Sequence, residues 1–280
     1  MRIALTGASG FIGRHVLREL HARGLDAVAL TRSSNSRCAH PGVSRWVELD
    51  ISHPPTNPFE AMGRPEVLIH LAWGGLPHYQ SSHHVEVELP AQQAFLSACV
   101  HQGLQRLVVT GTCYEYGLAD GELTEDAATK PCTQYGIAKD KLREALLILS
   151  QELGFNMTWL RLFYLYGEGQ SEKSLYRSLH AAIERGDKTF DMSGGEQVRD
   201  FLSIQVASRF IVDLALHENA AGAFNVCSGN PITVKHMVEA WIAASHAAIT
   251  LNLGRMPYSP NERMAFWGSR RKLEHTLAMT

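Results

Sequence analysis

Short apolar runs alternate along the first half of the chain with longer segments in which apolar residues recur every three or four positions. The apolar runs predict strands at residues 2–6, 26–31, 46–49, 66–72 and 106–111. The periodic segments predict helices at 11–23, 85–102 and 135–151. Strands separated by helices imply βαβ units, so we expect an α/β fold with a doubly wound parallel sheet that binds ligands beyond the carboxyl ends of its strands.

The second half of the chain has a more mixed pattern. Helical periodicity recurs at about residues 175–185, 205–216 and 234–244, with short strands between these segments. We therefore predict a dinucleotide-binding domain of the Rossmann type at residues 1–165. Residues 166–280 are predicted to form a small α/β lobe that binds substrate and is interleaved with the main domain.

Composition narrows the class of protein. The chain has 280 residues, 45% hydrophobic and 19% charged, with a net charge of −2, which argues against nucleic acid or an anionic membrane as the main partner. Five scattered cysteines without a C-x-x-C pair suggest neither disulfides nor zinc. No signal peptide or membrane span is apparent, so we expect a cytoplasmic enzyme. We expect no metal site, and we interpret His78, His83 and His84 as solvated loop residues.

A glycine-rich segment, Gly7-Ala-Ser-Gly10-Phe-Ile-Gly13, lies between the first strand and the first helix. Glycines there permit a tight turn and the close approach of a pyrophosphate, and the helix N-terminus offers free N–H groups to its charge. A glycine triplet alone is a weak signal, but strand, glycines and helix in this order favour a dinucleotide site. Its expected residues are Gly7, Ser9, Gly10, Phe11, Ile12 and Gly13.

The ends of the next strands supply further cofactor candidates. Arg32 follows the second strand, where NAD-selective folds carry an acidic residue that holds the ribose. An arginine there suits a 2′-phosphate, so we expect NADP, with NAD and an inert, solvated Arg32 as the alternatives. Asp50 and Ile51 would flank the adenine, and Leu71 and Ala72 would pass under the cofactor.

Tyr135-Gly-Ile-Ala-Lys139 opens the third predicted helix. Residues four apart on a helix lie on the same face, so a phenol and an ammonium share one site. A nearby cation favours the phenolate and lowers the phenol pKa. Taken alone, such a pair is more often two surface residues that have no role than a catalytic pair.

The segment after the fifth strand, Thr112-Cys113-Tyr114-Glu115-Tyr116-Gly117, together with the Tyr135–Lys139 pair, resembles extended short-chain dehydrogenases/reductases of the NAD-dependent epimerase/dehydratase family. Residues 161–167, 198–201 and 224–229 resemble three further motifs of this family. The resemblance implies a catalytic triad of Thr112, Tyr135 and Lys139. It also places Thr110, Tyr135, Lys139 and Phe163 at the cofactor.

The same resemblance implies a nucleotide-activated sugar as substrate and a homodimer as the assembly, formed through the helices at 85–102 and 135–151. Arg199 would meet the diphosphate, because a guanidinium suits phosphate oxygens. The other substrate candidates are Trp73, Thr112, Cys113, Tyr114, Tyr164 and Arg263. Tyr164 replaces an asparagine common in the family. Cys113 and Tyr114 replace the Asp and Glu of its dehydratases, so elimination of water is not supported.

Three functions remain open at this point. A reductase acting at carbon 4 of a nucleotide-linked 4-keto-6-deoxyhexose would exchange its cofactor, which suits an NADP-selecting Arg32. A 4-epimerase would use the same triad with tightly held NAD. A non-catalytic NAD(P)-sensing regulatory protein would have no need of an intact triad. Two roles are open for Cys113: an additional acid, or a small buried residue behind the cofactor.

Overall fold

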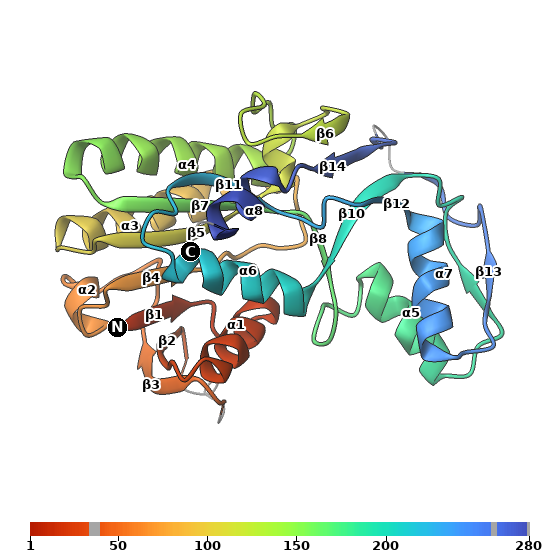
Figure 1. Cartoon of the computed structure of the whole chain (residues 1–280), viewed down its shortest axis with the longest axis horizontal. Coiled ribbons are helices and arrows are strands. Elements are labelled where there is room, and N and C mark those ends of the chain that lie inside the picture. Colours follow the sequence, from red (N-terminus) through yellow and green to blue (C-terminus); the bar gives the residue numbers. More distant parts are fainter. Residues whose placement is uncertain (34–39, 259–261, 279–280) are drawn as a thin grey trace.

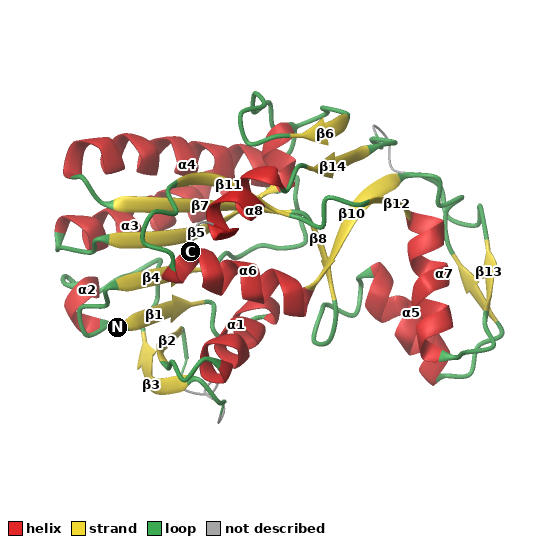
Figure 2. Cartoon of the chain, in the orientation of Figure 1, coloured by secondary structure: helices red, strands yellow, loops and turns green. Residues whose placement is uncertain are grey.

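The computed structural model describes residues 1–33, 40–258 and 262–278. A broad layered part contains the main sheet, and a smaller lobe with α5, α7 and β13 extends from one end of it (Figure 1, Figure 2). Cys38 lies outside the described residues.

The main sheet has seven strands in the order β11-β7-β5-β4-β1-β2-β3. All neighbouring strands pair in parallel. The strands are β1 (Ile3–Thr6), β2 (Ala27–Thr31), β3 (Val43–Glu48), β4 (Val67–His70), β5 (Arg106–Thr112), β7 (Asn156–Leu162) and β11 (Gly222–Val226). The order reverses between β1 and β4, where open α/β sheets bind ligands. The prediction of a doubly wound Rossmann-type sheet is confirmed.

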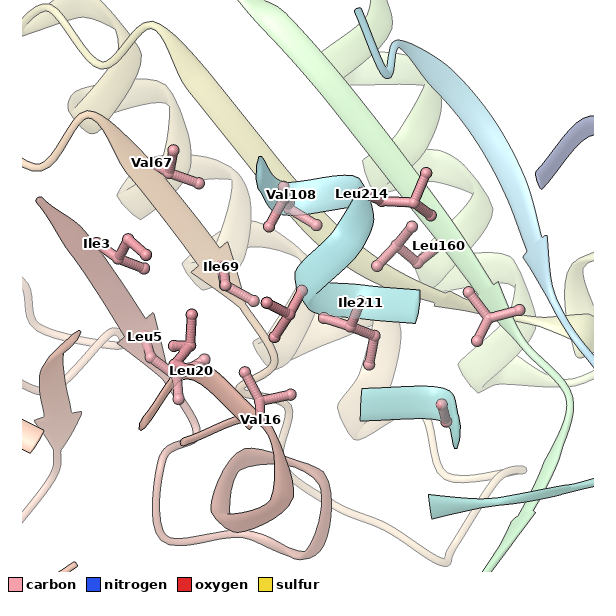
Figure 3. Packing of buried hydrophobic residues seen from close by; sticks show 14 of the residues in the cluster. Ile3, Leu5, Val16, Leu20, Val67, Ile69, Val108, Leu160, Ile211 and Leu214 are labelled. Carbon is pink, nitrogen blue, oxygen red and sulfur yellow. The ribbon is translucent and has the colours of Figure 1, made fainter. Parts of the chain in front are cut away.

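Helices cover both faces of this sheet because its strands are apolar on both sides. Ile3 and Leu5 of β1 pack with α1 (Phe11–Ala22) and α6 (Ile204–Leu216), while Ala4 between them faces α3 (Leu89–His101) and α4 (Gln134–Leu153). The first of these two clusters also takes in strand residues from β4, β5 and β7 (Figure 3). Two short helices, α2 (Pro58–Ala61) and α8 (Arg271–Ala278), add Phe59 and Leu273 to the two clusters.

The smaller lobe has its own core. Its sheets are β12-β10-β8 and β13-β9, and β14 pairs with β6 beside them. The strands and helices are β6 (Gly121–Leu123), β8 (Tyr164–Tyr166), β9 (Thr189–Asp191), β10 (Val198–Ser203), β12 (Pro231–Thr233), β13 (Thr250–Asn252), β14 (Phe266–Gly268), α5 (Leu175–Glu184) and α7 (Val234–Ser245). Because α6, β11 and α8 pack with the main sheet, the chain passes repeatedly between the two parts. A domain boundary at residue 165 stays a prediction.

Several expectations from composition can be compared with the structure. In the described part of the chain, no helix is long and apolar enough to cross a membrane, and no group of His, Cys, Asp and Glu could hold a metal ion. Cys99, Cys113, Cys132 and Cys227 are free thiols. The interpretation of His84 as a solvated loop residue is wrong: it begins a π-helical turn, η2 (His84–Glu88), and is fully buried.

Candidate active site

A cavity of about 290 Å³ opens at the carboxyl edge of the sheet, where the strand order reverses. Eight of the predicted cofactor residues line it: Gly7, Ser9, Gly10, Arg32, Asp50, Ile51, Leu71 and Ala72. The residues that the sequence did not indicate for the cofactor are Thr6, Leu30, Thr31, Leu49, Ser52, Trp73, Gly74, Glu88 and Gln92. Trp73, expected at the substrate, also borders this cavity.

The glycine turn under the cavity leaves no room for a side chain at Gly7 or at Gly13. Gly7 has a φ of 68°, and a Cβ atom there would lie 2.9 Å from the Ala72 nitrogen. A Cβ atom at Gly13 would lie 2.2 Å from the Gly7 carbonyl oxygen. Phe11 and Ile12, in the first turn of α1, pack against the core cluster. This bare backbone at a helix N-terminus fits a dinucleotide pyrophosphate.

A chain of hydrogen bonds runs beneath the cavity from β1 to η2. The Thr6 hydroxyl accepts from the backbone N–H groups of Leu71 and Ala72 (3.0 and 3.2 Å), so its hydrogen is left for His70 Nδ1 at 3.0 Å. His70 Nε2–H then donates to Gln92 Oε1 (2.7 Å), and Gln92 Nε2 donates to Glu88 (3.0 Å). Burial, with Lys139 nearby, lowers the pKa of His70 to about 3 and keeps it neutral.

The three expected catalytic residues come from two neighbouring elements. Thr112 ends β5 and is the N-cap of a short 3₁₀ turn, η3 (Cys113–Tyr116), with its hydroxyl accepting from the Tyr114 N–H (3.2 Å). Tyr135 and Lys139 lie on the first turns of α4, whose N-cap is Thr133. Lys139 Nζ donates to the Thr110 carbonyl (2.9 Å) and lies 3.9 Å from the centre of the Trp73 ring. The structure thus brings Thr110 and Trp73 to the predicted triad.

Both ionisable triad residues are buried, and burial dominates their pKa values. It lowers the pKa of Lys139 to about 7, against the opposing charges of Glu115 and Glu88. It raises the pKa of Tyr135, while the Thr112 side chain acts in the opposite direction. The expectation that Lys139 lowers the Tyr135 pKa is wrong for this structure, because burial raises that pKa.

An aromatic cluster surrounds Tyr135, and the sequence did not indicate it. The Trp73 indole N–H donates to His84 Nδ1 (3.1 Å), and the other ring nitrogen of His84 bonds the His78 carbonyl (3.1 Å). The Tyr135 N–H donates to the Tyr79 carbonyl (3.0 Å), and the centres of the two rings are 5.6 Å apart. This hydrogen bond and this ring contact therefore hold the segment between β4 and η2 against the first turn of α4.

The expected substrate residues other than Trp73 and Thr112 gather on the lobe side of Tyr135. Tyr164 lies close enough to Tyr114 to add to the rise that burial causes in the Tyr114 pKa, and the Arg199 guanidinium lies 5.7 Å from the centre of the Tyr164 ring. The buried Arg199 guanidinium pairs with Glu262 and donates to the Arg263 carbonyl. The Arg199 and Arg263 guanidinium groups both stack on the same ring, Phe266, at 4.7 and 3.4 Å. Arg199 and Arg263 thus lie in one cluster with the tyrosines, and Glu262 balances the charge of Arg199.

Two remaining candidates, Cys113 and Phe163, lie in the packing beside this cluster. Cys113 is buried, and burial raises the pKa of its thiol to about 12, as befits a small packed residue. Phe163, expected at the cofactor, is buried between Tyr116 and Phe266. It is not among the residues that line the 290 Å³ cavity.

The fold has a glycine turn where the strand order reverses, and a threonine, a tyrosine and a lysine at the carboxyl edge of the sheet. This combination defines an NAD(P)-dependent oxidoreductase or epimerase of the extended short-chain dehydrogenase/reductase type. The chain belongs to the NAD dependent epimerase/dehydratase family, whose model matches residues 3–227. It is thus an enzyme of this class and not the non-catalytic sensor considered above.

Comparison with individual proteins agrees with this family. The chain is 30% identical over 273 residues to dTDP-6-deoxy-L-talose 4-dehydrogenase (NAD(+)) from Aggregatibacter actinomycetemcomitans, covering 96% of this chain and 100% of that one. It is 26% identical over 256 residues to dTDP-4-dehydro-6-deoxyglucose reductase from Escherichia coli (85% and 79% covered). UDP-glucuronic acid 4-epimerase from Bacillus cereus shares the fold, with a TM-score of 0.83, 21% identity and coverage of 100% and 94%.

Proposed function

We propose that the protein reduces, or in reverse oxidises, carbon 4 of a nucleotide-linked 4-keto-6-deoxyhexose with NADP as cofactor. The observation that carries the proposal is the meeting of Thr112, Tyr135 and Lys139 beside the dinucleotide cavity that Arg32 borders. The sugar class is supported by similarity to two enzymes named for 6-deoxyhexoses linked to dTDP.

In the proposed mechanism, the bound nicotinamide supplies the hydride for the ketone carbon. Tyr135 donates a proton to the ketone oxygen, a step for which a well-placed general acid contributes about 10²–10⁴-fold. The Lys139 ammonium holds the nicotinamide ribose and stabilises the phenolate that Tyr135 becomes. Thr112 donates a hydrogen bond to the same oxygen and stabilises the charge that develops on it.

The substrate diphosphate is proposed to meet Arg199, with Arg263 next to it. Both guanidinium groups lie over Phe266, which faces the same cluster as Tyr114 and Tyr164. A diphosphate that reaches Arg199 must compete with Glu262, its present partner. Tyrosine hydroxyls next to the guanidinium groups are suited to the hydroxyl groups of a sugar.

Epimerisation at carbon 4 is the second candidate, favoured by the close fold similarity to the Bacillus cereus 4-epimerase. Stoichiometry separates the two activities. Incubation with NADPH and a panel of nucleotide 4-keto-sugars should oxidise one NADPH for each sugar consumed, with the new hydroxyl at carbon 4. Protein that carries tightly bound NAD and equilibrates two nucleotide sugars without added cofactor would overturn the reductase assignment.

Cofactor choice is proposed to depend on Arg32, which is exposed at the rim of the cavity. Arg32→Asp should weaken NADPH binding far more than NADH binding, because a carboxylate repels the 2′-phosphate and can hold a bare ribose. Relatives of the chain are named for NAD(+) and for NAD(P)(+), so the position is worth testing. Fluorescence titration of both reduced cofactors measures the effect. Equal weakening of the two would show that Arg32 does not select the cofactor.

A homodimer through α3 and α4 is also part of the proposal. The two helices form a shallow groove of about 220 Å³, lined on the α4 side by Leu146, Ile148 and Leu149. Ile148 is 57% exposed and Leu153, at the end of the same helix, is 45% exposed. Apolar side chains exposed along α4, next to α3, favour burial against a second copy of the chain.

A further inference from the structure

Glu115 is a fully buried carboxylate directly behind Thr112. It accepts hydrogen bonds from the Thr112 backbone N–H (2.9 Å), from Trp159 Nε1 (3.0 Å) and from Arg161 Nε (2.8 Å). Arg161 is itself buried and also donates to the Tyr116 hydroxyl and the Glu125 carbonyl. Burial raises the pKa of Glu115, and the Arg161 charge together with these hydrogen bonds opposes that shift. Glu115 therefore connects the end of β5 to β7 through an ion pair that water does not reach.

The bond from Glu115 to the Thr112 backbone holds the turn that positions the Thr112 hydroxyl. It closes a capping box, in which Glu115 accepts from the Thr112 N–H while the Thr112 hydroxyl oxygen accepts from the following turn. With that oxygen accepting from the Tyr114 N–H, the Thr112 hydrogen is free to donate outward. A substrate oxygen that gains negative charge needs such a donor.

Glu115 also faces the helix that carries Tyr135 and Lys139. Arg143, one turn beyond Lys139 on α4, lies 3.9 Å from the Glu115 carboxylate and bonds Asp140 at 2.8 Å. Burial lowers the Lys139 pKa, and the Glu115 charge is the largest influence that opposes this. The other titratable groups that interact with Lys139 are Glu88, His70 and His84.

We propose that Glu115 is a positioning residue of this active site: it fixes the Thr112 hydroxyl as an outward donor and supplies the negative charge that faces Lys139. The inference rests on the proposed roles of Thr112 and Lys139. If Glu115 served only to pair Arg161, changes at Glu115 would affect folding and leave the pH dependence of the site unchanged.

Two substitutions separate the effect of the Glu115 charge from the effect of its side-chain length. Glu115→Gln keeps a side-chain oxygen for the Thr112 N–H but removes the charge. The pH at which NADPH binding weakens, as Lys139 loses its proton, should then fall by roughly one unit, because an opposite charge no longer favours the ammonium. Glu115→Asp keeps the charge but draws the carboxylate back from Thr112. It should lower kcat by on the order of 10–100-fold, with KM for the sugar and the pH midpoint near the wild-type values.

Glu125→Gln is the matched control, because it makes the same chemical change in a side chain whose oxygen bonds the Asn225 N–H. It should keep the wild-type pH midpoint and kcat. Fluorescence titration of NADPH from pH 6 to 9 needs no sugar substrate, so it tests Glu115 even if the wild-type protein fails to reduce any 4-keto-sugar. An unshifted midpoint in Glu115→Gln would overturn the inference. If that variant does not fold, wild-type kcat in Glu115→Asp would overturn it.

Discussion

Replacing Tyr135 with phenylalanine is expected to abolish turnover while leaving NADPH binding nearly intact. The phenyl ring can keep the contacts of Tyr135 with Trp73, Tyr79 and His84, but it has no proton to give to the ketone oxygen. Loss of a positioned general acid predicts a fall in kcat of about 10²–10⁴-fold. Oxidation of NADPH, followed by absorbance with the keto-sugar in excess, measures the fall.

Tyr166→Phe makes the same change in β8, where the ring packs on Trp241 in the core of the lobe, and serves as the control. It should retain wild-type turnover. A Tyr135→Phe enzyme within about tenfold of wild-type kcat would show that the proton comes from another group, since general acid catalysis contributes more than this.

Replacing Lys139 with methionine is expected to inactivate the enzyme and to stabilise the protein without ligands. The pKa of Lys139 falls from 10.5 to about 7 on burial, so the folded state binds its proton less tightly than the unfolded state. One pKa unit corresponds to about 1.4 kcal/mol, so half of this shift alone predicts a gain of roughly 2 kcal/mol at pH 7. Methionine fills a similar volume and carries no charge into the site.

The sign of this effect can be tested by pH. The destabilisation by Lys139 is fully present below about pH 7 and disappears as pH rises towards 10.5, where the unfolded state also loses the proton. Urea unfolding should therefore show a large stability difference between Lys139→Met and wild type at pH 7, and a smaller one at pH 10. Lys141→Met, an exposed position two residues further on, should change stability little. A less stable Lys139→Met protein would contradict the expectation.

Most of the main sheet could be predicted from the sequence because its strands are short apolar runs between periodic segments. The strand β7, Asn156–Leu162, was not among the predicted strands, since its Arg161 interrupts the apolar pattern. That arginine is only 2% exposed because Glu115 pairs with it. The local hydrophobic pattern cannot show that a charged residue is neutralised by a partner 46 positions away.

The candidate site was predictable where backbone geometry demands a particular residue. Gly7 and Gly13 stand where any Cβ atom would meet the backbone. The aromatic cluster around Tyr135 was not predictable, because it depends on a π-helical turn at His84 that no 3.6-residue pattern indicates. The spacing Thr112-x-x-Glu115 was a visible signal of a capping box, and the resemblance to a family motif drew attention to its first residue only.

The hydrogen-bonded row from Thr6 through His70 and Gln92 to Glu88 determines where protons can travel in this enzyme. Each hydrogen in the row points the same way, and conduction along it would require Gln92 to carry a proton and His70 to take a second one. With a pKa of about 3, His70 does not accept that proton at neutral pH. The row therefore does not conduct protons along the underside of the cavity. In the proposed mechanism, the proton that replaces the one given up by Tyr135 therefore does not come through this row.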